Sequence, residues 1–221
     1  MTPHLDSPIP PTADPLTEAL QFLRMEGIFY CRSELTAPWS LGLPPMPDCV
    51  WFHVVTAGSC VLIDSRGGRH EVRRGDLVIL PHGAGHSATD DPDLDPAPVM
   101  DLPHEYLSPS YAILRHGGGG GRVDLICGAV RLAHPAARNL IEVLPEVIHV
   151  DPSTGRRALE WLPSVLGMIA AETAEPQPGS EAVVTRLCDI LVISAIRSWL
   201  DTDPAAKTGW LGALQDQQIG R

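Results

Sequence analysis

Four residues of types that bind transition metals stand out in this sequence: His53, His82, His86 and Cys127. Neutral imidazole nitrogens and a thiolate sulfur are the donors that tetrahedral zinc prefers. His53 and Cys127 each lie in an apolar segment typical of a buried strand, at 50–55 and 123–132. Because inward-pointing side chains of such strands meet in a common core, we expect a zinc site formed by these four residues.

His82 and His86 belong to a turn that follows the apolar run 77–80. Pro81 fixes its own φ, and two glycines nearby allow positive φ, so the chain can reverse its direction within a few residues. The two histidines are four residues apart, but a loop rather than a helix carries them, and the sequence leaves their geometry open. A buried, hydrogen-bonded histidine is the alternative interpretation for each, as inert packing is for the cysteine.

Thiol oxidation is a second chemistry open to this chain, at Cys31 and Cys127. Thiolates close to a metal or an imidazole are the ones that oxidants attack. Cys31 would pair with a distant thiol in a redox switch, or else be a passive packing residue. We therefore expect an oxidant as one kind of effector.

The compartment and the partners are limited by composition. Five scattered cysteines without a C-x-x-C pair, and a Pro-rich start at 1–15 unlike a signal peptide, predict a reducing cytoplasm. The net charge of −11 argues against a DNA-binding or anionic-membrane surface, because phosphate binding needs an excess of Lys and Arg. The apolar stretch 190–196 is too short to span a bilayer. We expect no membrane partner, and contact with DNA only through another segment.

The chain is predicted to be mainly β, with helices towards its C-terminal end. The 22 prolines and 20 glycines favour short strands and turns over a helical bundle. Strands are expected at 28–31, 50–55, 60–63, 70–72, 77–80, 123–132 and 147–150, and helices at 16–25, 159–173 and 181–200. The Pro-rich stretch 88–103 and the glycine tract 117–121 predict a long loop on either side of the short apolar piece 111–114, and His104 is expected to lie in this loop.

These elements divide the sequence into four parts. We expect a disordered arm at 1–14, a β-barrel at 15–150, a helical dimerisation segment at 151–203 and a linker at 204–221. The helix at 181–200 is apolar on almost every face, so it must be covered on several sides. A two-fold homodimer is the natural source of the missing cover.

The segment 75–86, GDLVILPHGAGH, resembles the second motif of the cupin barrels, with Asp90 in place of the usual asparagine. The whole chain resembles the N-terminal cupin-type sensor domain of AraC-type transcriptional regulators. The parts that carry this resemblance follow one another in the family's order: Trp51-Phe52-His53 with Gly58, the segment 75–86, Ile126-Cys127-Gly128, Leu144-Pro145 and two helices with Glu172 and Pro178-Gly179. The resemblance implies a jelly-roll (double-stranded β-helix) barrel followed by a two-helix dimerisation unit.

The resemblance also implies a function. A domain of this kind senses a small molecule, a metal or an oxidant and passes that state to a helix-turn-helix DNA-binding domain. The tail at 204–221 is similar to the linker that leads into such a unit, and about twenty residues are too few to form one. We expect the DNA-binding domain to be absent from this chain.

Two other functions stay open at this point. One is a small metal-dependent cupin enzyme, an isomerase or a dioxygenase, although the His-x-His of the enzymatic first motif does not occur in this sequence. The other is a structural dimerisation module whose barrel is filled by side chains. We expect no catalytic residues and, as cofactor, at most zinc.

Overall fold

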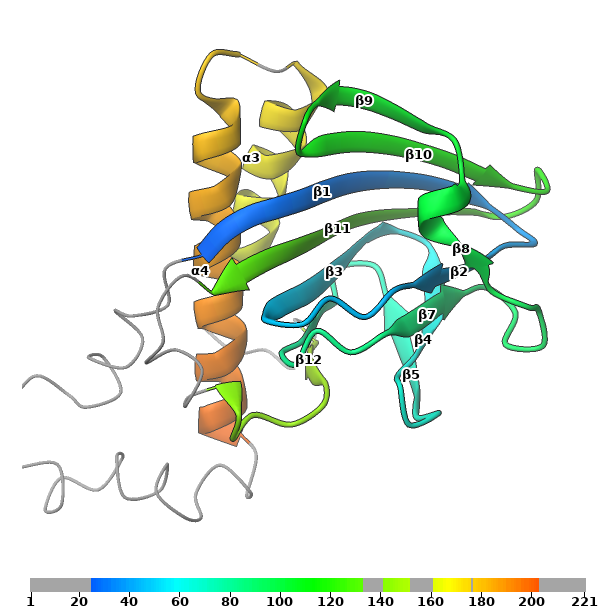
Figure 1. Cartoon of the computed structure of the whole chain (residues 1–221), viewed down its shortest axis with the longest axis horizontal. Coiled ribbons are helices and arrows are strands. Elements are labelled where there is room, and N and C mark those ends of the chain that lie inside the picture. Colours follow the sequence, from blue (N-terminus) through cyan, green and yellow to red (C-terminus); the bar gives the residue numbers. More distant parts are fainter. Residues whose placement is uncertain (1–24, 133–140, 152–160, 176, 203–221) are drawn as a thin grey trace, which may run out of the picture.

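The computed structural model describes residues 25–132, 141–151, 161–175 and 177–202, which form two facing sheets and two helices (Figure 1). The large sheet has seven strands in the order β12-β6-β3-β11-β1-β10-β9, and the small sheet has five in the order β5-β4-β7-β2-β8. The strands are β1 (Met25–Thr36), β2 (Ser40–Leu43), β3 (Cys49–Ala57), β4 (Ser59–Ile63), β5 (Arg69–Arg73), β6 (Leu77–Leu80), β7 (His86–Thr89), β8 (Ala97–Pro98), β9 (His104–Ser108), β10 (Tyr111–Gly117), β11 (Arg122–Leu132) and β12 (Ile148–Val150).

Apart from its edge strand β9, the large sheet is buried on both faces, and alternation along its strands divides its side chains between two cores. In β3, Trp51 and Val55 point towards the small sheet and pack with Leu62, whereas Phe52 and Val54 belong to the opposite core. Successive side chains of a strand point to opposite faces, so neighbouring residues serve different cores. The core between the sheets is called the interior below, and the other is called the outer core.

The outer core lies under the helices α3 (Leu162–Ala174) and α4 (Ser180–Thr202), which run side by side along the large sheet (Figure 1). Pro163 falls in the first turn of α3, where a missing amide hydrogen costs nothing. The buried residues of α4 include Val184, Leu191 and Trp199. Neither of these helices, in the part of the chain that the structure describes, is long and apolar enough to cross a membrane.

Most of the predicted elements are confirmed. Every predicted strand overlaps an observed one, and the two C-terminal helices begin and end within three residues of their predicted limits. The fold is mainly β with C-terminal helices, as predicted, but the strands form two open sheets rather than a closed barrel. The arm at 1–14, the linker at 204–221 and all but the last residue of the helix expected at 16–25 lie outside the described residues.

The loop predicted on either side of the apolar piece 111–114 is wrong on its N-terminal side. This region contains β8, a short 3-10 helix η1 (Val99–Asp101), β9 and β10, and β10 pairs in parallel with β1. His104 therefore lies in a strand and not in a loop. The sequence of β9 does not indicate a strand, because β9 lies at the edge of the sheet. Three of its five residues are exposed, so it shows no alternation of apolar and polar residues.

Candidate functional site

The register of the large sheet brings Cys31, Cys127 and His53 into one row. Cys31 of β1 lies opposite Cys127 of β11, and Cys127 lies opposite His53 of β3. Residues directly opposite one another in adjacent strands point to the same face. All three point into the interior, where His86 reaches them from β7 of the small sheet. We call these four residues the interior row.

Hydrogen bonds connect three members of the interior row. The Nδ1 atom of His53 lies 3.1 Å from the Cys127 sulfur, and its Nε2 atom lies 2.7 Å from Nε2 of His86. The Nδ1 atom of His86 lies 3.1 Å from the carbonyl oxygen of Ala84. Trp51 stacks on the His53 ring at a centroid distance of 6.2 Å and an interplanar angle of 10°, which fixes the plane of the imidazole.

These contacts specify where each proton resides. The Ala84 carbonyl only accepts, so His86 carries its hydrogen on Nδ1 and presents Nε2 as an acceptor. His53 must then donate from Nε2, which leaves its Nδ1 atom as the acceptor for the Cys127 thiol. With both histidines neutral, one arrangement of the protons gives a donor and an acceptor to each hydrogen bond from the Cys127 thiol to the Ala84 carbonyl.

Burial keeps this network uncharged. Loss of solvation lowers the pKa of His53 well below its ordinary value, with a further decrease from the neighbouring His86. Burial also lowers the pKa of His86 from 6.5 to about 4. The thiols respond in the opposite direction, because burial raises the pKa of Cys127 far above its usual range and that of Cys31 to about 11. The reduced resting site thus holds two neutral imidazoles and two protonated thiols.

The turn before His86 depends on glycine. Gly83 has a φ of +61°, and a Cβ atom there would collide with the backbone carbonyl of Met46. The Gly83 carbonyl accepts a hydrogen bond from the Met46 amide at 2.8 Å, so two loops are in contact at this point. This close approach carries the chain from β6 into β7 and delivers His86 to the interior.

His82 does not join the interior row. Its Nε2 atom donates a hydrogen bond to the carbonyl oxygen of Leu144 at 3.0 Å. The structure therefore brings together three of the four predicted metal-binding residues, His53, His86 and Cys127. It adds Cys31, which the sequence indicated only as a candidate for oxidation. Its position beside Cys127 was not predicted, because strand register cannot be derived from one sequence.

The zinc prediction meets a geometric difficulty at His53. The two nitrogens of an imidazole point in different directions, and here Cys127 faces one while His86 faces the other. No group of three or more His, Cys, Asp or Glu side chains within the described ranges is arranged to hold one metal ion. A zinc ion between the two Nε2 atoms would need them about 3.3 Å apart, a short opening from 2.7 Å. Zinc stays a prediction.

The interior has little free space around the row. The cavity bordered by Cys31, His53 and Cys127 has a volume of about 20 Å³, enough for a single water molecule. Most of its other walls are apolar side chains, among them Phe29, Leu125 and Met100, and Ser33 adds one hydroxyl group. The space beside the interior row is therefore large enough for a water molecule or an ion of similar size, but an organic molecule does not fit there.

Comparison with known proteins identifies the family. Residues 14–201 match a family model described as Cupin (Cupin_6). The chain belongs to this family. Its relatives include the HTH-type transcriptional regulator MtrA of Neisseria gonorrhoeae, 25% identical over 209 residues, and a putative AraC-like transcription regulator of Streptomyces antibioticus, 28% identical over 208 residues. A third is the RCS-specific HTH-type transcriptional activator RclR of Escherichia coli, 23% identical over 189 residues.

The matches cover nearly all of this chain but only part of the relatives. The alignments span 94% and 93% of the chain and 66% of both MtrA and the Streptomyces protein; for RclR the shares are 85% and 56%. They confirm the resemblance to AraC-type regulators that the sequence motifs indicate. Among solved structures, fatty-acid-bound ToxT from Vibrio cholerae has a TM-score of 0.42 at 11% identity, over 86% of this chain and 60% of that one.

Proposed function

We propose that this cupin domain is the effector-sensing and dimerisation domain of a cytoplasmic AraC-type transcription regulator, which passes its state to a DNA-binding domain. One observation carries the proposal: consecutive residues of β1 belong to the two cores. Cys31 belongs to the interior row, and Tyr30 faces α4, where its hydroxyl donates to Oγ1 of Thr185 at 3.2 Å. A displacement of β1 at the interior row therefore acts directly on α4.

The adjoining strands support the same connection. In β11, Cys127 faces the interior and Gly128 faces the outer core, where a Cβ atom would collide with the Phe52 ring. The Tyr30 and Phe52 rings lie 6.3 Å apart between their centroids, on the outer core side. Since tightly packed cores transmit strain instead of absorbing it, this arrangement is suited to coupling the two faces.

The small interior cavity favours a metal ion or an oxidant as the effector of the interior row. Oxidation would join Cys31 and Cys127, which lie opposite each other, by one S–S bond; the two thiols lose two protons and two electrons to an oxidant such as hydrogen peroxide, which becomes water. The raised thiol pKa values predict a slow reaction with weak oxidants.

Dimerisation is proposed for the uncovered side of the helix pair. On α4, Val183 and Ile190 are each 43% exposed and lie seven residues apart, so they share one face of the helix. Met168 of α3 is also exposed. A second copy of this chain, packed across a two-fold axis, would cover these side chains.

The test is to measure metal content and self-association of the protein purified reduced and without added metal. Cys127→Ala and His86→Ala are the test variants, and Cys60→Ala is the matched control, because Cys60 is an interior thiol outside the row. We expect zinc loading to change the dimer dissociation constant at least threefold in the wild type and in Cys60→Ala, but not in His86→Ala, which lacks one of the two facing Nε2 atoms. We expect peroxide treatment to change it at least threefold in the wild type and in Cys60→Ala, but not in Cys127→Ala, which lacks one of the two thiols that would be joined. Unchanged self-association under both treatments would contradict the sensing function. No observation among the described residues supports the alternative that this domain is a metal-dependent enzyme. Metal-dependent turnover of a substrate would support that alternative.

A further inference from the structure

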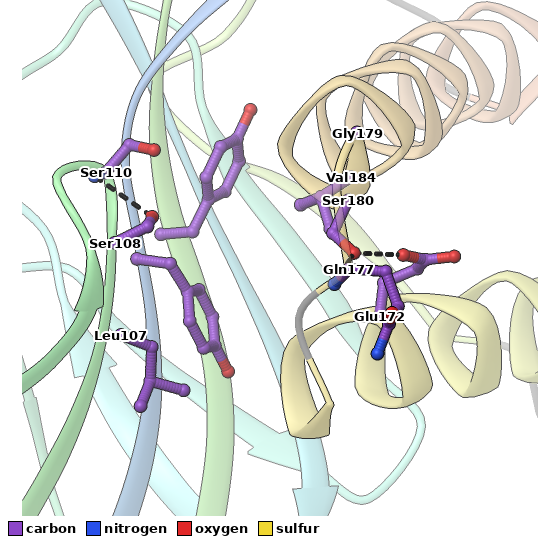
Figure 2. Close-up of a pocket in the computed structure, with 10 residues that line it drawn as sticks. Leu107, Ser108, Ser110, Glu172, Gln177, Gly179, Ser180 and Val184 are labelled. Carbon is purple, nitrogen blue, oxygen red and sulfur yellow. Dashed lines mark hydrogen bonds between the residues drawn. The ribbon is translucent and has the colours of Figure 1, made fainter.

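A larger cavity lies on the other face of the large sheet, where the ends of β9 and β10 meet the junction of α3 and α4 (Figure 2). Its volume is about 190 Å³. Ser108 and Ser110 line it from the sheet, and Glu172, Ser180 and Val184 line it from the helices. Leu107, Gln177 and Gly179, all exposed, border its mouth.

The volume limits the occupant to a single ring. An engineered cavity of about 150 Å³ in a protein core binds benzene, whereas sites for drug-sized ligands have about 300 Å³ or more. The two tyrosines at 30 and 111 and two aliphatic side chains, Leu107 and Val184, provide apolar walls. Aromatic rings pack well against such walls because ring faces and edges attract one another.

Two polar groups of the cavity indicate which substituent an aromatic ligand should have. The Ser110 side chain is only 7% exposed, and its hydroxyl oxygen has no hydrogen-bond partner among the described residues. The Glu172 carboxylate accepts a hydrogen bond from the Ser180 hydroxyl at 2.6 Å, which holds it beside the cavity (Figure 2). Among the described residues that line the cavity, Glu172 is the only one with an acidic or basic side chain. The site therefore attracts hydrogen-bond donors and cations and repels carboxylates.

We propose that this cavity binds a small aromatic molecule with a short hydrogen-bond-donating substituent, an arylalkylamine or an aryl alcohol. This inference deepens the proposed sensing function and rests on it: such a ligand would contact both the sheet and α4, and would give the domain an organic effector separate from the interior row. Because the ligand would lie between the large sheet and α4, its binding would change how closely these two elements pack.

The experiment is a titration of the ¹⁵N-labelled protein, followed by amide chemical shifts, with benzylamine, benzyl alcohol and benzoate as probes. We expect shifts centred on residues 108–111 and 177–184, tightest binding for benzylamine and weakest for benzoate. Glu172→Gln should weaken benzylamine about tenfold, the loss expected for one charge-assisted hydrogen bond, and leave benzyl alcohol within twofold. Glu175→Gln, an exposed carboxylate at the end of the same helix, is the matched control and should bind like the wild type.

A second variant guards against misfolding of the first. Ser110→Ala removes only the unpartnered hydroxyl and should weaken benzyl alcohol about fivefold. The inference is overturned if the probes shift residues of the interior row instead, if benzoate binds as tightly as benzylamine, or if both variants bind like the wild type. None of these results bears on the metal and oxidant responses of the interior row, which test the proposed function separately.

Discussion

The two faces of the large sheet differ in what they can recognise. The interior face carries the histidines and thiols of the interior row but has a cavity of only about 20 Å³. The outer face is almost entirely apolar and has a cavity of about 190 Å³ at its edge. One face thus has reactive groups without space, and the other has space with few polar groups. A single sheet can separate an ionic or redox signal from an organic one in this way, because alternate residues of each strand serve different faces.

The largest expected effect comes from the outer core. Phe52→Ala should lower the free energy of unfolding by about 3–5 kcal/mol, since the ring is fully buried between Gly128 and the helices. Urea denaturation measures this loss. Tyr106→Ala is the control on the same sheet, because Tyr106 is 62% exposed on β9, and it should change stability by about 0.5 kcal/mol or less. Equal losses in the two variants would contradict the burial described here.

The interior row should produce a pH dependence that the outer core does not. The folded pKa of His86, about 4, lies below the ordinary 6.5 of the unfolded chain, so the unfolded state takes up a proton first as the pH falls. Stability is therefore complete above about pH 6.5 and is lost between pH 6.5 and 4, by about 3 kcal/mol. Buried His53 adds to the loss in the same direction.

Urea denaturation at several pH values, with a chelator present, measures this dependence. His86→Phe should reduce the slope between pH 6.5 and 4, and His116→Gln on β10 is the histidine control. A slope unchanged in His86→Phe would show that His86 is not held neutral by burial.

The proton arrangement of the row predicts a smaller effect that sharpens the comparison between two thiols. A serine at 127 can still donate to Nδ1 of His53, so Cys127→Ser should be more stable than Cys127→Ala by about 1 kcal/mol. At Cys60, where no hydrogen bond of the thiol is seen among the described residues, the order should reverse, because a buried hydroxyl without a partner is unfavourable. A Cys127→Ser variant that is less stable than Cys127→Ala would contradict the assignment of the Cys127 proton.

The smallest effect is expected away from both faces. Arg66 pairs with Glu146 on the surface, where the Arg66 side chain is 75% exposed and the Glu146 side chain 31%. Arg66→Ala should lower the free energy of unfolding by less than about 1 kcal/mol and should not alter the pH dependence. A loss as large as that of Phe52→Ala would show that surface charges, and not the two cores, dominate stability.

Much of the fold could be predicted because its strands have clear apolar runs and glycine turns. The segment 75–86 predicted the turn that delivers His86, and the apolar segments around His53 and Cys127 predicted their burial. The edge strand β9 was missed, because exposed strands lack an apolar pattern. His82 was predicted to join the site, but it turns to the Leu144 carbonyl, a contact between segments 62 residues apart that local sequence does not reveal.

The rest of the site depends on tertiary register. The place of Cys31 in the interior row follows from the pairing of β1 with β11, which one sequence does not specify. The cavity beside Glu172 and Ser110 forms only when the helix junction packs on the sheet edge. Ser110 has no local pattern that marks it as part of a site, whereas Glu172 is distinguished as the one acidic residue of α3.

The central claim is that a change in the interior row reaches α4 through the large sheet, and hydrogen exchange of α4 amides tests it most directly. The measurement compares wild type, His86→Ala and Cys60→Ala, with exchange corrected for the global stability of each protein measured in urea. We predict faster exchange around Thr185 in His86→Ala and wild-type exchange in Cys60→Ala. Identical exchange of α4 in all three proteins would contradict the claim, because the two faces of the sheet would then be uncoupled.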